Sequence, residues 1–314
     1  MAASVTGLGF SGLGWLGESL IKDLPQVPGL ELAAVQDARL DLAREIGQRY
    51  ASPWAGDRFE SLLEVPGVDA IVICTPNALH VPQAQRALQA GKHVLVQKPL
   101  ALTSADAQAT VDMAQASQRL LFVDYTYRFL ETVQPLRRSV EDVVAVRAAF
   151  HNIYGPGAEK AWFFDPALSG GGALTDLGVH LLDLALWLLE PRRVSLEHRD
   201  LDARPIERRA SLRARLDEVP FELEVSWNAA RPDTQIFFEL QTRGGRVRWE
   251  NVDGSFFRFR TWGDESLLVE RETSLRIDTL RAFASALRTG TAPPIDGRVY
   301  AVLDQAYGRA ARLT

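Results

Sequence analysis

The sequence predicts an α/β N-terminal Rossmann domain followed by an α+β C-terminal domain with a large, mainly antiparallel open sheet. Short apolar runs alternate with helical patterns up to residue 124, a glycine-rich turn follows the first run, and strand-like runs with short turns fill 193–271. Alternation is typical of a parallel sheet with helices on both faces, and consecutive strands are typical of an antiparallel one. We therefore expect domains over 1–124 and 125–314, with C-terminal helices able to pack back on the first.

The first domain is expected to alternate strands with helices. The strands are the apolar runs 4–11, 30–36, 69–76, 93–97 and 120–125, and the helices are 15–25, 39–49, 78–90 and 103–118. The runs are short and nearly continuous, as expected for strands buried on both faces.

The second domain is expected to begin with a strand over 143–150, an irregular loop and an apolar helix over 171–189. Strand-like runs follow at 208–216, 220–227, 234–242, 245–251, 255–261 and 266–272, and helices at 275–289 and 296–312. An open sheet needs cover on its second face. We expect self-association through this sheet, as a homodimer or homotetramer, with exposed aromatic side chains among Phe237, Phe238, Trp249, Phe256, Phe257 and Trp262.

The composition excludes several classes of protein. A net charge of −5, with basic residues interspersed among acidic ones, argues against a nucleic-acid partner, and a single cysteine, Cys74, excludes an intramolecular disulfide. No apolar stretch is expected to be long enough to span a membrane, and the N-terminus lacks the pattern of a signal peptide. A cytoplasmic protein without a membrane partner is expected.

Two overlapping glycine patterns could form a dinucleotide-binding turn, one beginning at Gly7 and one at Gly12. Only the second, Gly12-x-Gly14-x-x-Gly17 with Trp15 and Leu16 inside it, follows a full strand and opens a helix. Its glycines would permit the tight turn and let the backbone approach a pyrophosphate at the helix N-terminus.

Asp37 ends the next strand, 20 residues after Gly17. Its carboxylate can bind ribose hydroxyls and would repel a 2′-phosphate, so NAD is slightly favoured over NADP as the cofactor. Arg39 would soften that preference.

Lys98 follows the buried strand 93–97 and precedes Pro99. Proline disfavours helical geometry before it, so Lys98 is expected at the carboxyl edge of the sheet, where α/β proteins bind ligands. A surface lysine on an edge strand is the alternative interpretation.

The apolar helix 171–189 carries one narrow ionisable stripe. Asp176, His180, Asp183 and Trp187 share one face at helical spacing, and leucines surround them. Ionisable groups on a buried helix must be paired or functional, so a catalytic pair and a structural Asp–His pair both remain open. No metal-ligand spacing accompanies Asp176, His180 and His151, and no G-x-S-x-G turn is present, so neither a catalytic metal nor a serine hydrolase is expected.

Six motifs together resemble the Gfo/Idh/MocA family of glucose–fructose oxidoreductase and inositol dehydrogenase relatives. They are GLGWLG (12–17), Asp37, CTPNALH (74–80), QKP (97–99), YRF (127–129) and SGGGALTDLGVHLLD (169–183). The resemblance implies that the cofactor cleft is lined by Thr75, Pro76, Asn77, His80, Gln97 and Lys98. It also implies that Lys98, Asp176 and His180 are catalytic, that the Lys98–Pro99 bond is cis, and that Arg128, Lys160 and Trp162 face substrate or cofactor.

The chain departs from the family at Gln97, where relatives usually carry Glu. The departure leaves the acid–base assignment open without removing Lys98, Asp176 or His180. The resemblance implies an NAD(P)-dependent oxidoreductase acting on a hydroxyl of a sugar, polyol or related small molecule. A glycoside hydrolase that keeps NAD bound and a non-catalytic dinucleotide or sugar sensor are the alternatives.

Overall fold

The computed structural model describes residues 5–203 and 206–309. It divides into two compact units. Unit 1 runs up to Asp124 and includes Arg276–Ile295, and unit 2 comprises Tyr125–Leu275 and the chain from Asp296 onward.

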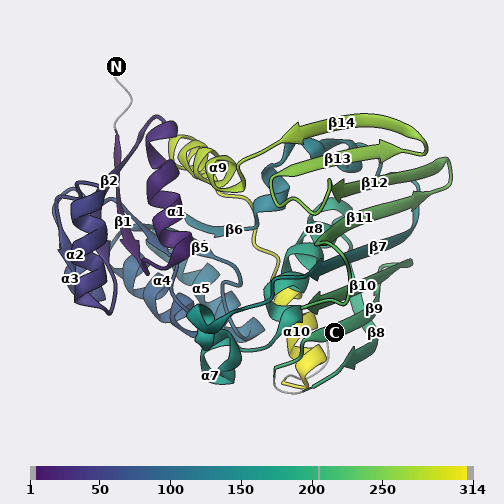
Figure 1. The fold of residues 1–314 in the computed structure, drawn as a ribbon, viewed down its shortest axis with the longest axis horizontal. Coiled ribbons are helices and arrows are strands. Elements are labelled where there is room, and N and C mark those ends of the chain that lie inside the picture. Colours follow the sequence, from purple (N-terminus) through teal and green to yellow (C-terminus); the bar gives the residue numbers. More distant parts are fainter. Residues whose placement is uncertain (1–4, 204–205, 310–314) are drawn as a thin grey trace. The chain divides into compact units, whose positions relative to one another are not determined.

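Unit 1 contains the expected Rossmann sheet (Figure 1). Its strand order is β3-β2-β1-β4-β5-β6, and all pairs are parallel. The strands are β1 Thr6–Ser11, β2 Leu30–Gln36, β3 Ala55–Gly56, β4 Ala70–Ile73, β5 His93–Gln97 and β6 Leu121–Asp124. The helices are α1 Trp15–Asp23, α2 Leu40–Arg49, α3 Phe59–Leu63, α4 His80–Gln89 and α5 Ser104–Ser117. The short elements β3 and α3 were not predicted from the sequence.

The order of the strands reverses at β1, which lies between β2 and β4. In open α/β sheets, ligands bind beyond the carboxyl ends of the strands at such a switch point. The residues after β1, β2, β4 and β5 are therefore the ones that the fold brings to this edge.

Helix α9 (Leu275–Thr289) belongs almost wholly to unit 1. It was expected in the second domain, 125–314, as one of the C-terminal helices able to pack back on the first. Its buried Phe283 contacts the Phe122 ring of β6 edge to face, with centroids 5.5 Å apart. Arg276 Nε donates to Asp23 Oδ2 at 2.7 Å. The apolar face of the helix and this ion pair explain why the segment returns to the first unit, whereas α10 (Gly297–Tyr307) remains in unit 2.

Unit 2 contains an eight-stranded sheet in the order β14-β13-β12-β11-β7-β10-β9-β8 (Figure 1). Only β7 and β10 pair in parallel, so the mainly antiparallel open sheet is confirmed. The strands are β7 Val143–Asn152, β8 Val194–Leu201, β9 Arg209–Leu216, β10 Val219–Trp227, β11 Gln235–Thr242, β12 Gly245–Asn251, β13 Arg258–Gly263 and β14 Ser266–Glu272. Strand β8, rich in charged residues, was not singled out from the sequence.

One face of this sheet packs against α8 (Val179–Leu189) and carries the aromatic core. Phe238 and Trp249 are fully buried there, so the expectation of exposed aromatic side chains was wrong for these two, whereas Phe257 is exposed as expected. The alternation of side chains along β11 and β12 puts these two rings on the inner face.

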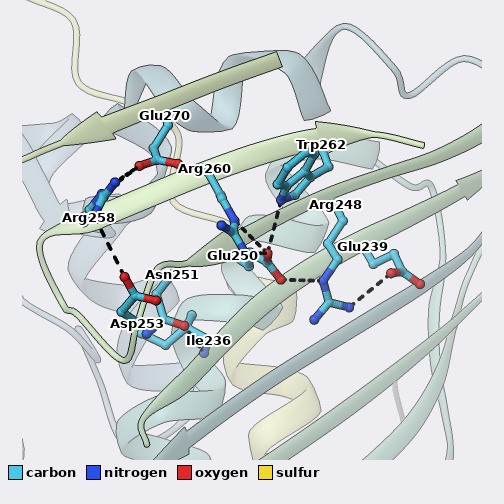
Figure 2. A network of polar contacts seen from close by, with 10 residues as sticks. All are labelled: Ile236, Glu239, Arg248, Glu250, Asn251, Asp253, Arg258, Arg260, Trp262 and Glu270. Carbon is cyan, nitrogen blue, oxygen red and sulfur yellow. Dashed lines mark hydrogen bonds and ion pairs between the residues drawn. The ribbon is translucent and has the colours of Figure 1, made fainter. Parts of the chain in front are cut away.

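The opposite face carries a network of charged pairs (Figure 2). Glu250 accepts hydrogen bonds from Arg248 Nε at 2.8 Å and Arg260 Nε at 2.9 Å, and Arg248 also donates to Glu239 at 3.1 Å. Phe237 and Trp262 on this face lie under the guanidinium groups of Arg248 and Arg260. The face is therefore polar rather than an exposed aromatic patch.

The expected helix 171–189 is not uniform. It begins with a π-helical turn over Leu174–Gly178 and continues as α8. The helical segment Pro166–Leu189 is long and apolar enough to cross a membrane, since a window of 18 residues within it has a mean hydropathy of 1.4. The expectation that no stretch of the chain would be long enough was therefore wrong. However, 78% of that window is buried inside the protein, which is typical of a core helix.

Candidate cofactor-binding and active site

The turn between β1 and α1 has the geometry of a dinucleotide-binding loop. Gly12 has φ +86°, and a Cβ there would lie 2.7 Å from the Cys74 carbonyl carbon and 2.8 Å from Thr75 N. A Cβ on Gly17 would overlap the Gly12 carbonyl oxygen, whereas one on Gly14 would meet no atom within 4 Å. The first and third glycines thus close the turn, and the second faces open space at the N-cap of α1.

The alternative glycine pattern is excluded by its position. Gly7 and Gly9 lie inside β1, where a Cβ on Gly7 would overlap the Gly67 carbonyl and one on Gly9 would press on Leu62 and Val68. These two glycines therefore serve packing beside the strand.

Asp37 is held against the glycine turn. Its Oδ2 accepts the Leu13 backbone N–H at 2.9 Å, and its Oδ1 lies 3.3 Å from Nε of the exposed Arg39. The carboxylate is 12% exposed, so its remaining lone pairs are available to a ligand at the turn. Inside the same turn, Trp15 is 63% exposed and Leu16 is half-buried.

The segment after β4 brings the CTPNALH motif to the same edge. Thr75 Oγ1 donates to Gln83 Oε1 at 2.8 Å, Asn77 is buried, and Pro76 lies between them at intermediate exposure. The ring nitrogens of buried His80 lie 2.7 Å from the Pro99 carbonyl and 2.8 Å from the Thr75 carbonyl. Burial lowers the pKa of His80. This histidine thus bridges the segments after β4 and β5.

Lys98 follows β5, which lies between β4 and β6, so it is not on an edge strand. The Lys98–Pro99 bond is cis, as the resemblance implies, and the lysine is half-buried. Gln97 is buried, and its amide donates to Asp124 Oδ2 at 2.8 Å. Burial raises the pKa of Asp124. Sequence reasoning missed Asp124 because its role depends on the neighbouring strand.

In unit 2 the glycine run before α8 fixes the start of the π-helical turn. A Cβ on Gly172 would overlap the Glu207 backbone, and the buried Glu207 carboxylate accepts the N–H groups of Gly172 at 3.1 Å and Leu174 at 2.8 Å. Two otherwise unpaired donors at the helix start are satisfied in this way. The turn then presents Asp176, and such π turns are frequent at functional sites.

Asp176 and His180 each contact an aromatic side chain of unit 2. Trp227 Nε1, at the end of β10, donates to Asp176 Oδ2 at 3.0 Å. The His180 ring lies 5.1 Å from the Tyr127 ring. Burial and the nearby Asp176 carboxylate raise the pKa of Tyr127. Trp227 was missed from the sequence, because nothing in β10 indicates that its ring reaches the helix.

Trp162 and Lys160 belong to the loop that packs on Trp227. The Trp162 and Phe163 rings are tilted by 37° with centroids 4.0 Å apart, and Phe163 meets Trp227 edge to face at 5.9 Å. Lys160 Nζ lies 5.8 Å from the Phe163 ring centre. The loop is thereby linked through Trp227 to Asp176.

Arg128 is buried and engaged in an ion pair. Its guanidinium binds both carboxylate oxygens of Asp183, with Nε 2.6 Å from Oδ2, and the two side chains are 3% and 1% exposed. Burial opposes the charge of Arg128, but the Asp183 carboxylate offsets this and raises the Arg128 pKa. This arrangement favours a structural role, so Arg128 is not part of the proposed site.

Within the described residues, no group of three His, Cys, Asp or Glu side chains could hold a metal ion. His151, one of the candidate ligands, instead places Nδ1 2.8 Å from Ser226 Oγ. Unit 1 thus offers a turn that can accept a ligand, and unit 2 by itself offers a carboxylate at Asp176 and an imidazole at His180.

The chain matches two models of one oxidoreductase family. The oxidoreductase family model with an NAD-binding Rossmann fold covers residues 7–125, and the GFO/IDH/MocA C-terminal domain model covers residues 138–248. The chain therefore belongs to the Gfo/Idh/MocA family of oxidoreductases.

Several curated relatives are dehydrogenases of sugars. The chain is 34% identical to D-glucoside 3-dehydrogenase of Escherichia coli (strain K12) over 51% of the chain and 47% of that protein. It is 28% identical to levoglucosan dehydrogenase of Pseudarthrobacter phenanthrenivorans over 49% and 42%. These alignments span about half of the chain and less than half of the relatives. D-xylose 1-dehydrogenase (NADP(+)) 2 of Haloferax volcanii is 29% identical over 91% of both chains.

Solved structures share the fold. Levoglucosan dehydrogenase in complex with NADH and levoglucosan has a TM-score of 0.84 at 18% identity, covering 98% of both chains. A 3-ketoreductase from Actinomadura kijaniata in complex with NADP has a TM-score of 0.80 at 21% identity, covering 96% of this chain and 95% of that one. These named relatives are dehydrogenases or reductases, so they lend no support to the hydrolase and sensor alternatives.

Proposed function

We propose that this chain is an NAD(P)-dependent dehydrogenase or reductase that acts on a hydroxyl, or the matching carbonyl, of a sugar, polyol or related small molecule. The observation that carries the proposal is the turn after β1, which leaves open space at Gly14 while backbone fills the space at Gly12 and Gly17. Such room at a helix N-terminus is what a pyrophosphate requires.

The residues around the turn fit a dinucleotide. Gly12–Gly17 would hold the pyrophosphate, Asp37 the ribose hydroxyls, and the segment Thr75–Asn77 would line the cleft beside them. When bound, the nicotinamide supplies the hydride acceptor or donor, so the protein must orient the substrate and move one proton.

Three side chains are proposed to bind the substrate hydroxyl, accept its proton and stabilise the charge that develops on its oxygen. His180 accepts the hydroxyl proton, because imidazole titrates near neutrality. Asp176 binds the substrate hydroxyl, with its carboxylate fixed by Trp227. Lys98 stabilises the negative charge that develops on the substrate oxygen. An exchange of roles between Lys98 and His180 is equally compatible with these residues.

The test follows the absorbance of reduced nicotinamide with NAD and NADP over a panel of sugars, polyols and lactones. His180→Ala is expected to lower kcat by about 100-fold or more while retaining cofactor binding. His198→Ala, on the exposed part of edge strand β8, is the matched control and should leave kcat unchanged. Glycoside cleavage without net reduction of cofactor, or cofactor binding without any turnover, would refute the proposal.

NAD is proposed as the preferred cofactor. A 2′-phosphate at this turn would face the Asp37 carboxylate, whereas the neighbouring Arg39 would attract it. Asp37→Ser is expected to raise the NADP-to-NAD ratio of kcat/KM about tenfold or more, because it removes like-charge repulsion. Arg39→Ser is the matched control and should lower that ratio. An unchanged ratio in Asp37→Ser would contradict the assignment.

We also propose that the chain self-associates through the sheet of unit 2, but through charged and aliphatic side chains instead of exposed aromatic ones. Paired charges on the outer face, together with exposed Leu267 and Leu268 on edge strand β14, support a contact that salt would weaken. Light scattering at micromolar concentration should give a dimer or tetramer at low salt, and a monomer at every salt concentration would refute it. A cytoplasmic location remains a proposal that rests on the single cysteine.

A further inference from the structure

A buried chain of hydrogen bonds lies in unit 1 at the carboxyl ends of β5 and β6. Gln97 and Asp124 are register partners across these strands, and the Gln97 amide donates to Asp124 Oδ2 at 2.8 Å. The hydroxyl of Thr279, on α9, lies 2.6 Å from Asp124 Oδ1. All three side chains are less than a tenth exposed.

This arrangement suits an ionised Asp124. A carboxylate accepts hydrogen bonds only, and here each oxygen faces a neutral side chain that can donate. Burial raises the pKa of Asp124, while Thr279, Gln97 and the charge of Lys98 oppose that rise. Two titratable groups near Asp124 are Lys98 after β5, whose charge lowers the pKa of Asp124, and Cys74 after β4, whose pKa Asp124 raises. Lys98 is the group of opposite charge among them.

We propose that Asp124 is the positioning residue for Lys98, supplying from β6 the carboxylate that position 97 lacks in this chain. Gln97 then serves as the amide that holds this carboxylate. Compared with a chain that has Glu at position 97, the negative charge lies on β6 instead of β5, and a hydrogen bond still joins the two strands. The inference rests on the proposed function, in which Lys98 acts on the substrate.

The geometry predicts that the charge can be exchanged between the two strands. In Gln97→Glu/Asp124→Asn, the amide at 124 can donate to the carboxylate at 97, and its oxygen can still accept from Thr279. The count of charges and hydrogen bonds is then unchanged. Asp124→Asn alone is nearly isosteric and keeps an amide pair, but it removes the charge. Thr279→Val is the matched control, since it removes one hydrogen bond and leaves the charge in place.

The first measurement needs no turnover. Urea unfolding of wild type, Lys98→Met, Asp124→Asn and the variant carrying both changes forms a double-mutant cycle at pH 7. The effect of Asp124→Asn on the unfolding equilibrium constant should differ about fivefold or more between the wild-type background and the Lys98→Met background. Additivity within a factor of two would overturn the electrostatic coupling of Lys98 with Asp124.

The second measurement compares kcat, KM and their pH profiles. Asp124→Asn should bind cofactor as wild type does, lose about ten- to hundredfold in kcat through misplacement of Lys98, and shift its pH profile. In the exchanged variant Gln97→Glu/Asp124→Asn, kcat should recover to within about threefold of wild type, and the pH profile should return to that of wild type. Thr279→Val should keep the wild-type pH profile. Wild-type kcat and pH profile in Asp124→Asn, or a folded exchanged variant without recovery, would overturn the inference. Full activity in Lys98→Met would instead refute the role of Lys98 in the proposed function, while the unfolding cycle still decides whether Asp124 and Lys98 are coupled.

Discussion

Trp227→Phe tests how the structure positions Asp176. The indole of Trp227 is 2% exposed, and its Nε1 donates to Asp176 Oδ2 at 3.0 Å. Phenylalanine keeps a ring on the contacts with Phe163 and Phe164 but removes the donor. Asp176 then loses the hydrogen bond that fixes its carboxylate.

The size of the effect follows from the hydrogen bond. A hydrogen bond to a charged group contributes about 1.5–3 kcal/mol. If this fixation is used in the transition state, kcat should fall by about 10- to 150-fold, since each 1.36 kcal/mol is a factor of ten. The free energy of unfolding should fall by a similar amount, which lowers Tm by roughly 2–5 °C in a protein of this size.

The assay is kcat and KM on a substrate found by the panel, with Tm measured in parallel. Trp249→Phe is the matched control, because Trp249 is also buried and its Nε1 donates to Thr132 Oγ1 at 3.0 Å, while a Phe ring keeps the contact with Tyr127. It should lose stability with little change in kcat. Equal losses of kcat in both variants, or none in Trp227→Phe, would refute the positioning of Asp176 by Trp227.

Three further predictions concern binding, stability and pH. Gly17→Ala should abolish cofactor binding, because its Cβ would overlap the Gly12 carbonyl, whereas Gly14→Ala should keep the wild-type Tm and weaken binding in titration calorimetry. Arg128→Met should cost about 3–5 kcal/mol in urea unfolding by leaving Asp183 buried without its partner, and a loss below about 1 kcal/mol would contradict this. Burial lowers the His151 pKa to about 4, so wild-type stability should be full above pH 6.5 and decline toward pH 4. His151→Gln should show a shallower decline, and equal slopes would refute it.

Local patterns predicted much of unit 1. The apolar runs, the glycine turn and Asp37 lie close together in sequence, and each acts through its own backbone or the next strand. Gly12 and Gly17 have the conformational and steric constraints that their spacing implied. The class of fold and the cofactor turn could therefore be predicted from the sequence.

The missed features depend on contacts between distant segments. The π turn before α8 rests on Glu207 binding Gly172 and Leu174. This pairing has no sequence spacing that periodicity can detect. The buried rings of β11 and β12 were misjudged for the same reason, since alternation alone does not say which face meets a helix.

Gln97 illustrates how a motif can mislead when it is read along one strand. In the sequence alone, glutamine at position 97 suggests that a negative charge beside Lys98 is missing. In a parallel sheet, however, the nearest polar neighbour of a residue at a strand end is on the adjacent strand, and Asp124 is the register partner of Gln97. A carboxylate and an amide that exchange places across such a pair leave the charge and the hydrogen bond intact. Motif departures at strand ends are therefore better judged in pairs, since only loss of the carboxylate from both strands would remove the charge near Lys98.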